Sequence, residues 1–176
     1  MKDIQTGLVE ALKYAIQMEL DGKRFYTLCQ NESTNKVGKE LFEWLAGQED
    51  FHRKRFEEIY DQILTKKGWP VTPVKPDRSP EFRTLFADAI RDLGTSVRTQ
   101  KSEFVNVEKA LEMEIKSRDF YSDRSGKAES DVEKAFFIAI SAEEQGHYLK
   151  LIDYKEYMSD PVGWFTRTER HSIDGE

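Results

Sequence analysis

The chain contains two similar halves, offset by 95 residues. Shared apolar positions are expected from helical patterning alone, but shared glutamates and histidines at inward positions are not. The matched pairs are Ala15 and Ala110, Met18 and Met113, Glu19 and Glu114, Phe25 and Phe120, Tyr26 and Tyr121, Phe42 and Phe137, Glu49 and Glu144, and His52 and His147. The repeat predicts two similar structural units joined in sequence.

Each half contains two long segments in which apolar residues recur at steps of three and four, the pattern of an amphipathic helix. The four expected helices run over about Asp3–Cys29, Lys36–Lys66, Glu103–Arg124 and Ser130–Met158. Short polar turns join the helices within each half, and Ser130 with Glu133 forms a capping-box pattern. Two short loops and one long crossover predict an all-α four-helix bundle of two antiparallel hairpins.

The crossover, at about residues 67–102, differs in composition from the helices. It holds four of the five prolines, and regular helix is excluded from its first part. Ser79 then resembles a helix cap with Pro80 at the first helical position, which predicts a short helix to about Leu93, ended by Gly94. We therefore expect one domain over residues 1–160, including this crossover, and a C-terminal tail over 161–176.

Composition excludes several classes of function. The chain has 33 acidic and 27 basic residues, a net charge of −6, and no basic stripe for nucleic acid or anionic lipid. Its single cysteine, Cys29, excludes an internal disulfide framework and a thiolate metal site. No apolar run approaches the roughly 20 residues that span a bilayer, and the first residues lack the pattern of a secretory signal. We expect a cytoplasmic protein that binds neither membrane nor nucleic acid.

Six ionisable residues interrupt the apolar stripes near their centres. They are Glu19, Glu49, His52, Glu114, Glu144 and His147. A single Glu-x-x-His is usually a solvated helix face, and a single Glu in a stripe often marks a misjudged period. The combination is different, because four ionised carboxylates without partners would be severely unfavourable in one core. Only Arg124 approaches the seam, at the far end of its helix, so two divalent cations would have to supply the counter-charge.

This set matches the pattern of dimetal bundle proteins, in which two helices each supply a Glu and the other two each supply Glu-x-x-His. We expect Glu19 and Glu114 as terminal ligands, Glu49 and Glu144 as bridges, and one histidine for each metal, His52 and His147. Mixed carboxylate and imidazole ligation suits iron or manganese, with zinc possible by misloading.

These residues resemble the rubrerythrin branch of the ferritin-like superfamily. The segments that carry the resemblance are Ala15–Tyr26, Gln48–His52, Ala110–Tyr121, Glu143–His147 and the tail segment Asp160–Phe165. The resemblance implies a ferritin-like bundle with two Fe ions per chain. It also implies an oxidoreductase that reduces hydrogen peroxide or dioxygen with electrons from a separate donor, such as a rubredoxin-like protein. We further expect a homo-oligomer, a dimer.

Tyr26 and Tyr121 follow the terminal glutamates by about two helical turns. They could hydrogen-bond to ligands of the other hairpin or relay an electron; a core tyrosine with a satisfied hydroxyl is the alternative.

The sequence departs from rubrerythrins proper in two ways: it lacks their four-cysteine module, and Ser117 stands where they carry the extra Glu of a redox-linked ligand exchange. The repeat mate of Ser117 is Gly22.

Two other functions stay open on the sequence. One is iron handling, with ferroxidase activity and storage inside a larger assembly. The other is a structural bundle whose inward acids bind zinc or nothing.

Overall fold

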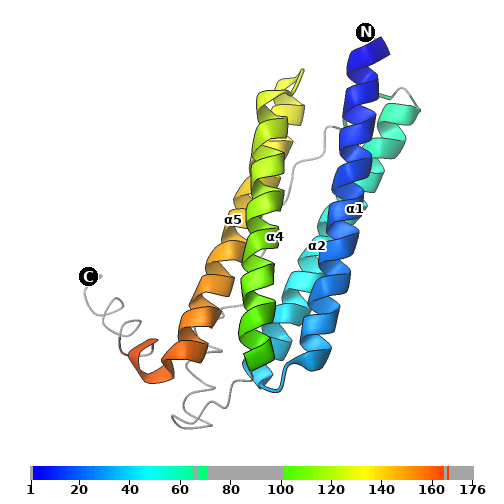
Figure 1. Ribbon diagram of the computed structural model, residues 1–176. Helices are drawn as coiled ribbons and strands as arrows, with labels where there is room; N and C mark the ends of the chain where they lie inside the picture. The colour runs from blue at the N-terminus through cyan, green and yellow to red at the C-terminus, as the bar shows by residue number, and fades with distance from the viewer. Residues whose placement is uncertain (1, 66, 71–100, 165, 167–176) are drawn as a thin grey trace.

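Four long helices form two antiparallel hairpins that lie side by side (Figure 1). The computed structural model describes residues 2–65, 67–70, 101–164 and 166. Helix α1 (Lys2–Glu32) pairs with α2 (Lys36–Leu64), and α4 (Lys101–Gly126) pairs with α5 (Asp131–Ser159). The predicted all-α four-helix bundle is confirmed, and each predicted helix is within three residues of its observed bounds.

Most of the predicted crossover, including its short helix over 80–93, falls outside the described residues. At its start, the ring of Trp69 packs against Phe136 and Phe137, with ring centroids 5.5 and 5.8 Å apart. Beyond α5 the chain makes a further helical turn over residues 161–164, and Trp164 is buried edge-on against Tyr157. Both tryptophans therefore cover ends of the core.

Side-chain caps set the starts of the second helix of each hairpin. The Asn35 side chain accepts a hydrogen bond of 2.7 Å from the backbone N–H of Gly38, and Ser130 accepts one of 3.2 Å from the N–H of Glu133. The return bond of the predicted capping box is different. The Glu133 carboxylate accepts from the N–H of Glu129 at 3.1 Å, and its other oxygen faces the Arg124 guanidinium, 3.8 Å away.

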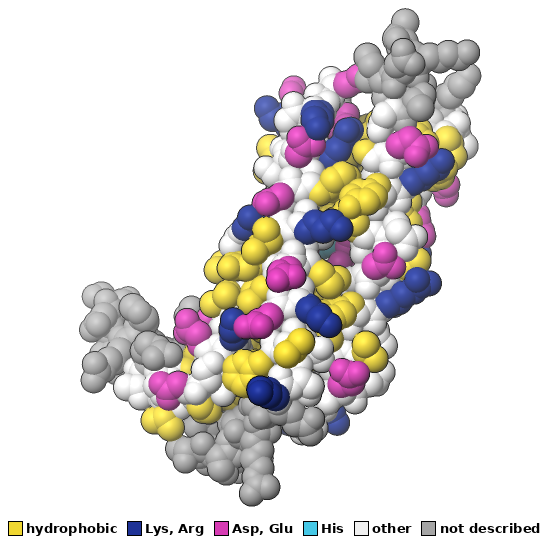
Figure 2. Space-filling view, in the orientation of Figure 1, with side chains coloured by type: hydrophobic (Ala, Val, Ile, Leu, Met, Phe, Trp, Pro, Cys, Tyr) yellow, Lys and Arg dark blue, Asp and Glu magenta, His cyan; other side chains and the backbone are white. Residues whose placement is uncertain are grey.

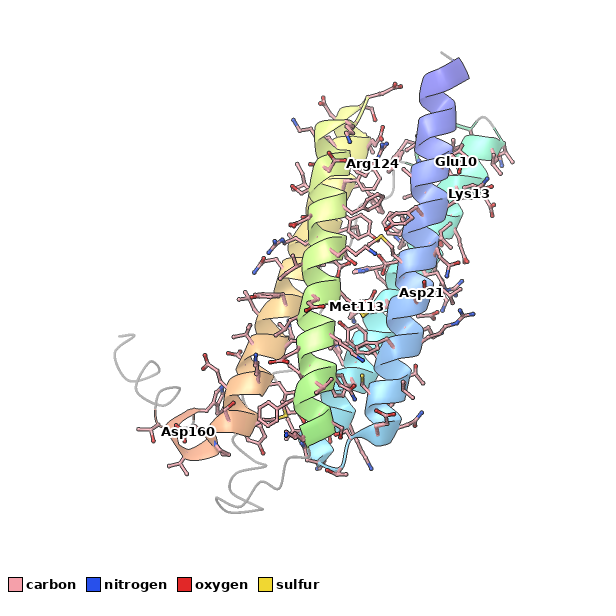
Figure 3. The ribbon with its side chains drawn as sticks, in the orientation of Figure 1. Glu10, Lys13, Asp21, Met113, Arg124 and Asp160 are labelled. Atoms are coloured by element: carbon pink, nitrogen blue, oxygen red, sulfur yellow. The ribbon has the colours of Figure 1, made fainter. Side chains whose placement is uncertain are left out.

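The interior consists of two apolar clusters with a polar layer between them. One cluster lies toward the α1–α2 turn and includes Phe42, Leu45, Val107, Leu151 and Tyr157; the other lies toward the opposite end and includes Leu12, Phe56, Ile59, Phe137 and Ile140. Figure 3 shows side chains of both hairpins in the space between them. Glu19, Glu49, Glu114 and Glu144 are buried at the level between the two clusters.

The outer surface mixes charges of both signs. Figure 2 shows lysine and arginine side chains interspersed with aspartate and glutamate over the visible face. Ion pairs between exposed side chains each contribute little stability. Because the two signs are interspersed, neither positive nor negative charge dominates this face. Within the described ranges, no helix has the length and apolar character needed to cross a bilayer.

Candidate metal centre

The structure brings all six residues predicted for the site together in the polar layer. Each is at most 5% exposed. Their potential ligand atoms form two overlapping groups, each with its atoms within 4.8 Å of one another: Glu49, Glu114, Glu144 and His147 in one, and Glu19, Glu49 and His52 in the other. Glu49 belongs to both groups, which is the position required of a ligand shared by two metals.

Glu144 lies between the two imidazoles. Its Oε1 is 3.1 Å from His52 Nδ1, and its Oε2 is 3.2 Å from His147 Nδ1. The two histidine rings are stacked, with centroids 5.6 Å apart and an interplanar angle of 21°. The two oxygens of one carboxylate therefore each face a different histidine, one from each hairpin.

The remaining carboxylates complete a nearly two-fold symmetric arrangement. Glu19 Oε2 lies 3.5 Å from His52 Nδ1, and Glu114 Oε2 lies 3.6 Å from His147 Nδ1. Glu49 Oε1 lies 3.7 Å from His147 Nδ1. The symmetry follows from the repeat, because each hairpin supplies one inward Glu from its first helix and one Glu-x-x-His from its second.

Four buried atoms that face this centre make no hydrogen bond within the described chain. They are Glu19 Oε2, His52 Nδ1, Glu114 Oε2 and Glu144 Oε1. Buried polar atoms normally have hydrogen-bond partners or bind a ligand. Four such atoms without a partner, all directed at one point, indicate that a ligand binds there. Oxygen and imidazole nitrogen donors in this number fit divalent iron or manganese.

No lysine or arginine of the described segments forms an ion pair with the six-residue cluster. Within those segments, the acids of the cluster form ion pairs with the two histidines. Arg124, labelled in Figure 3, lies near the end of α4 and faces Glu133 and the Phe137 ring. Met113, also labelled there, directly precedes Glu114 and marks the level of the centre. Lysine and arginine side chains of the described segments therefore do not balance the charge of these acids.

The electrostatics of the metal-free cluster favour bound protons. Burial and repulsion from Glu19 and Glu144 raise the pKa of Glu49, and burial and repulsion from Glu144 raise the pKa of Glu114 to about 8. Burial also acts to raise the pKa of Glu144, but the two imidazoles outweigh it and hold that pKa below its ordinary value.

The imidazoles show the converse effect. Burial acts to lower the pKa of His147, but Glu114 and Glu144 outweigh it and raise that pKa to about 9. For His52, burial likewise acts to lower the pKa, but the nearby carboxylates of Glu143, Glu144 and Glu19 outweigh it and raise that pKa. Metal binding would therefore have to displace protons from both histidines.

Each inward tyrosine hydrogen-bonds across to the other hairpin. The Tyr26 hydroxyl donates to Glu114 Oε1, and the Tyr121 hydroxyl donates to Glu19 Oε1. Burial and the adjacent carboxylates raise the pKa of both phenols, so both stay protonated. Each tyrosine holds one oxygen of a glutamate and leaves the other oxygen facing the centre.

Sequence reasoning missed Glu143 as a contact of the site. Its Oε2 lies 2.7 Å from His52 Nε2, the ring nitrogen that points away from the centre, and its side chain is only 16% exposed. Partners of this kind orient a ligating imidazole and increase its basicity. The available signal in the sequence was the glutamate directly before Glu144. When one residue of a helix faces the core, its neighbour in sequence can face an adjacent helix.

A second buried polar cluster, also missed, lies at the end of the bundle near the α1–α2 turn. Glu103 Oε1 accepts hydrogen bonds from Ser33 Oγ at 2.5 Å, Asn35 Nδ2 at 3.3 Å and Tyr154 at 2.6 Å. Glu103 lies four residues before Val107 and seven before Ala110, on the buried face of its helix, and this spacing was the available signal. With hydrogen-bond donors from both hairpins, this cluster links them rather than forming part of the candidate centre.

Comparison with protein families agrees with the geometry. The family model described as Rubrerythrin matches residues 10–154, a range that includes all six cluster residues, both tyrosines and Glu143. Comparison with curated proteins and with solved structures gives no match.

Proposed function

Because the chain belongs to the rubrerythrin family, we propose that its buried cluster holds two iron ions. We further propose that it reduces hydrogen peroxide or dioxygen with electrons from a separate protein donor. The observation that carries the proposal is Glu144, whose two carboxylate oxygens each face the Nδ1 of a different buried histidine. A carboxylate held in this way is suited to bridge two metals.

The ligand sets follow from proximity. Glu19 and His52 would hold one ion, Glu114 and His147 would hold the other, and the carboxylates of Glu49 and Glu144 would be shared. Two divalent ions would balance the four carboxylates, which removes the large penalty of burying unpaired anions. Manganese or zinc could occupy the same donors, so the identity of the metal is part of the proposal.

When bound as ferrous iron, the pair supplies the two electrons that, with two protons, convert one hydrogen peroxide into two water molecules. The protein holds the ligands in place and excludes solvent. Tyr26 and Tyr121 fix one oxygen of each terminal glutamate through their hydroxyl protons, and Glu143 fixes the His52 ring through Nε2. The apolar clusters on both sides of the layer limit its contact with solvent.

The proposal assigns the supply of electrons to a separate donor. The chain has a single cysteine, which burial and the nearby Glu32 keep protonated by raising its pKa to about 12. It therefore cannot supply the four thiolates of a rubredoxin-type iron site. A rubredoxin-like donor is the class that we propose.

Anaerobic reconstitution tests the function. The metal-free protein is loaded with ferrous iron, its iron content is measured, and peroxide and oxygen are added in separate samples. We expect two irons per chain and the oxidation of both by one equivalent of peroxide, followed by re-reduction by a donor. Fewer than two irons per chain would contradict the proposal. Iron in large excess over two, in a multi-subunit shell seen by light scattering, would indicate storage instead.

A further inference from the structure

Gly22 lies on the buried face of α1, three residues after Glu19. A Cβ atom at this position would lie 2.9 Å from Glu49 Oε2, 3.2 Å from its Cδ and 3.3 Å from its Cγ. The distance of 2.9 Å to Glu49 Oε2 is shorter than Cβ atoms show in real structures, so a side chain at position 22 would force Glu49 to move. The missing side chain therefore leaves space that the Glu49 carboxylate uses.

The backbone of α1 gives no other reason for glycine at this position. Among the described residues, only Gly68 has a positive φ, so Gly22 has a conformation that any residue adopts. Glycine inside a helix is less favourable than alanine by about 1 kcal/mol. Space next to Glu49 is the feature of the structure that explains this residue.

The two shared carboxylates are held to different degrees. Both oxygens of Glu144 face a histidine nitrogen, at 3.1 and 3.2 Å. Glu49 has a single, longer contact of this kind, 3.7 Å from Oε1 to His147 Nδ1, and its Oε2 faces Gly22. The repeat mate of Gly22 is Ser117, so the equivalent place in the other hairpin carries a side chain.

We propose that Gly22 is a positioning residue that gives Glu49 room to change its contacts with the metals, so that Glu49 is the movable shared ligand and Glu144 the fixed one. This inference rests on the proposed function, because it requires Glu49 to bind both ions. When Glu49 moves toward Gly22, one coordination position opens for a small exogenous ligand. A methyl group at position 22 removes that space.

The test compares Gly22→Ala with Gly47→Ala. Gly47 is an exposed glycine of α2 with nothing within 4 Å of a built Cβ, so its substitution gives the same gain in helix propensity without touching Glu49. Each protein is loaded with Co(II), which reports its coordination number through its visible absorption, and is then titrated with sodium azide. We expect two Co(II) per chain in all three proteins, and azide binding at least about tenfold weaker in Gly22→Ala alone, with an altered Co(II) spectrum.

Each outcome decides the question. Azide binding and Co(II) spectra in Gly22→Ala that equal those of the wild type would show that Gly22 serves packing alone, and the inference would be wrong. Loss of helical circular dichroism in metal-free Gly22→Ala would have the same meaning. Fewer than two Co(II) in Gly22→Ala with full helicity would also overturn the inference, since glycine at position 22 would then be needed to hold the metals rather than to let Glu49 move. Fewer than two Co(II) in the wild type would refute the proposed dimetal function itself.

Discussion

At the level of single residues, Glu144 has the shortest contacts to the metal-facing nitrogens of both histidines. The imidazoles of both hairpins are arranged around this one carboxylate, which is fully buried. Its surroundings stabilise its anion, whereas those of Glu49 and Glu114 favour the protonated acid. Glu144 is therefore the carboxylate of the cluster whose anion the metal-free protein stabilises, as a ligand of the proposed metals would require.

Replacing Glu144 with alanine is expected to reduce bound iron from two ions per chain to one or none, because both metals lose a shared ligand. Turnover with peroxide should fall to background. Metal analysis after gel filtration measures the effect. Glu112→Ala, an exposed change on α4, is the matched control and should retain both ions. Full occupancy and turnover in Glu144→Ala would show that the bridging role is assigned wrongly.

Replacing Tyr121 with phenylalanine removes the hydroxyl that holds Glu19 and leaves a buried carboxylate oxygen without its donor. We expect the free energy of unfolding of the metal-free protein to fall by about 1–3 kcal/mol. We also expect metal affinity to fall by about tenfold. Urea denaturation and metal titration measure the two effects. Tyr14→Phe, at a 45% exposed position, should change neither quantity.

Replacing Glu143 with glutamine keeps an acceptor for His52 Nε2 but removes its charge. The imidazole then becomes a weaker ligand, and we expect about a tenfold loss of affinity for one of the two metals. A Co(II) titration should resolve this as one weakened and one unchanged site. Equal weakening of both sites, or of neither, would count against a specific contact with His52.

At the level of the elements, the starts of α2 and α5 look alike in sequence but differ in their surroundings. Asn35 caps α2, and its Nδ2 also donates to the buried Glu103 and to Tyr154. Ser130 caps α5 at an exposed position. The α2 cap therefore connects the two hairpins, whereas the α5 cap is local.

This difference predicts unequal costs of removing the two caps. Ser130→Ala should lower the free energy of unfolding by about 1 kcal/mol, the usual value for an exposed cap. Asn35→Ala should lower it by about 2–4 kcal/mol, because Glu103 and Tyr154 also lose a partner. Denaturant titration of both variants provides the comparison. Equal losses would mean that the Glu103 cluster adds nothing to the cap.

At the level of the whole molecule, the bundle surrounds a charged layer with apolar clusters on both sides. Without metal, the folded protein must hold protons that the unfolded chain would release. The pKa of Glu114 is raised from 4.5 to about 8 and that of His147 from 6.5 to about 9. Between the ordinary and the raised values, the folded state binds more protons than the unfolded state, so stability falls as pH rises.

We therefore expect the metal-free protein to lose stability steadily from about pH 5 to about pH 9. Metal displaces these protons, so the metal affinity should rise with pH over the same range. Urea denaturation of chelator-treated and metal-loaded protein across this range measures both effects. Glu144, whose pKa is lowered from 4.5, acts in the opposite direction only in more acidic solution. Metal-free stability that is flat or rises with pH would contradict the expectation.

The sequence by itself determined the helices and the inward faces. Apolar residues that recur at steps of three and four, such as Leu12, Phe42, Phe56 and Ile140, are buried, and so are the six acids and imidazoles between them. Periodicity is enough for this, because a helix places residues three and four apart on one face whatever it packs against. The internal repeat also predicted the near two-fold symmetry of the cluster, since the same residue pattern in both hairpins places corresponding side chains at the same level of the bundle.

The tertiary structure alone decided which atoms meet across the bundle. Tyr26 and Glu114, His52 and Glu143, and Gly22 and Glu49 each come from different helices, and no spacing within one helix relates them. The rotation and height of each helix relative to its neighbours set these contacts, through the packing of side chains distant in sequence. For that physical reason, the Glu144 carboxylate lies between two imidazoles, whereas one oxygen of its repeat mate, Glu49, lies against Gly22.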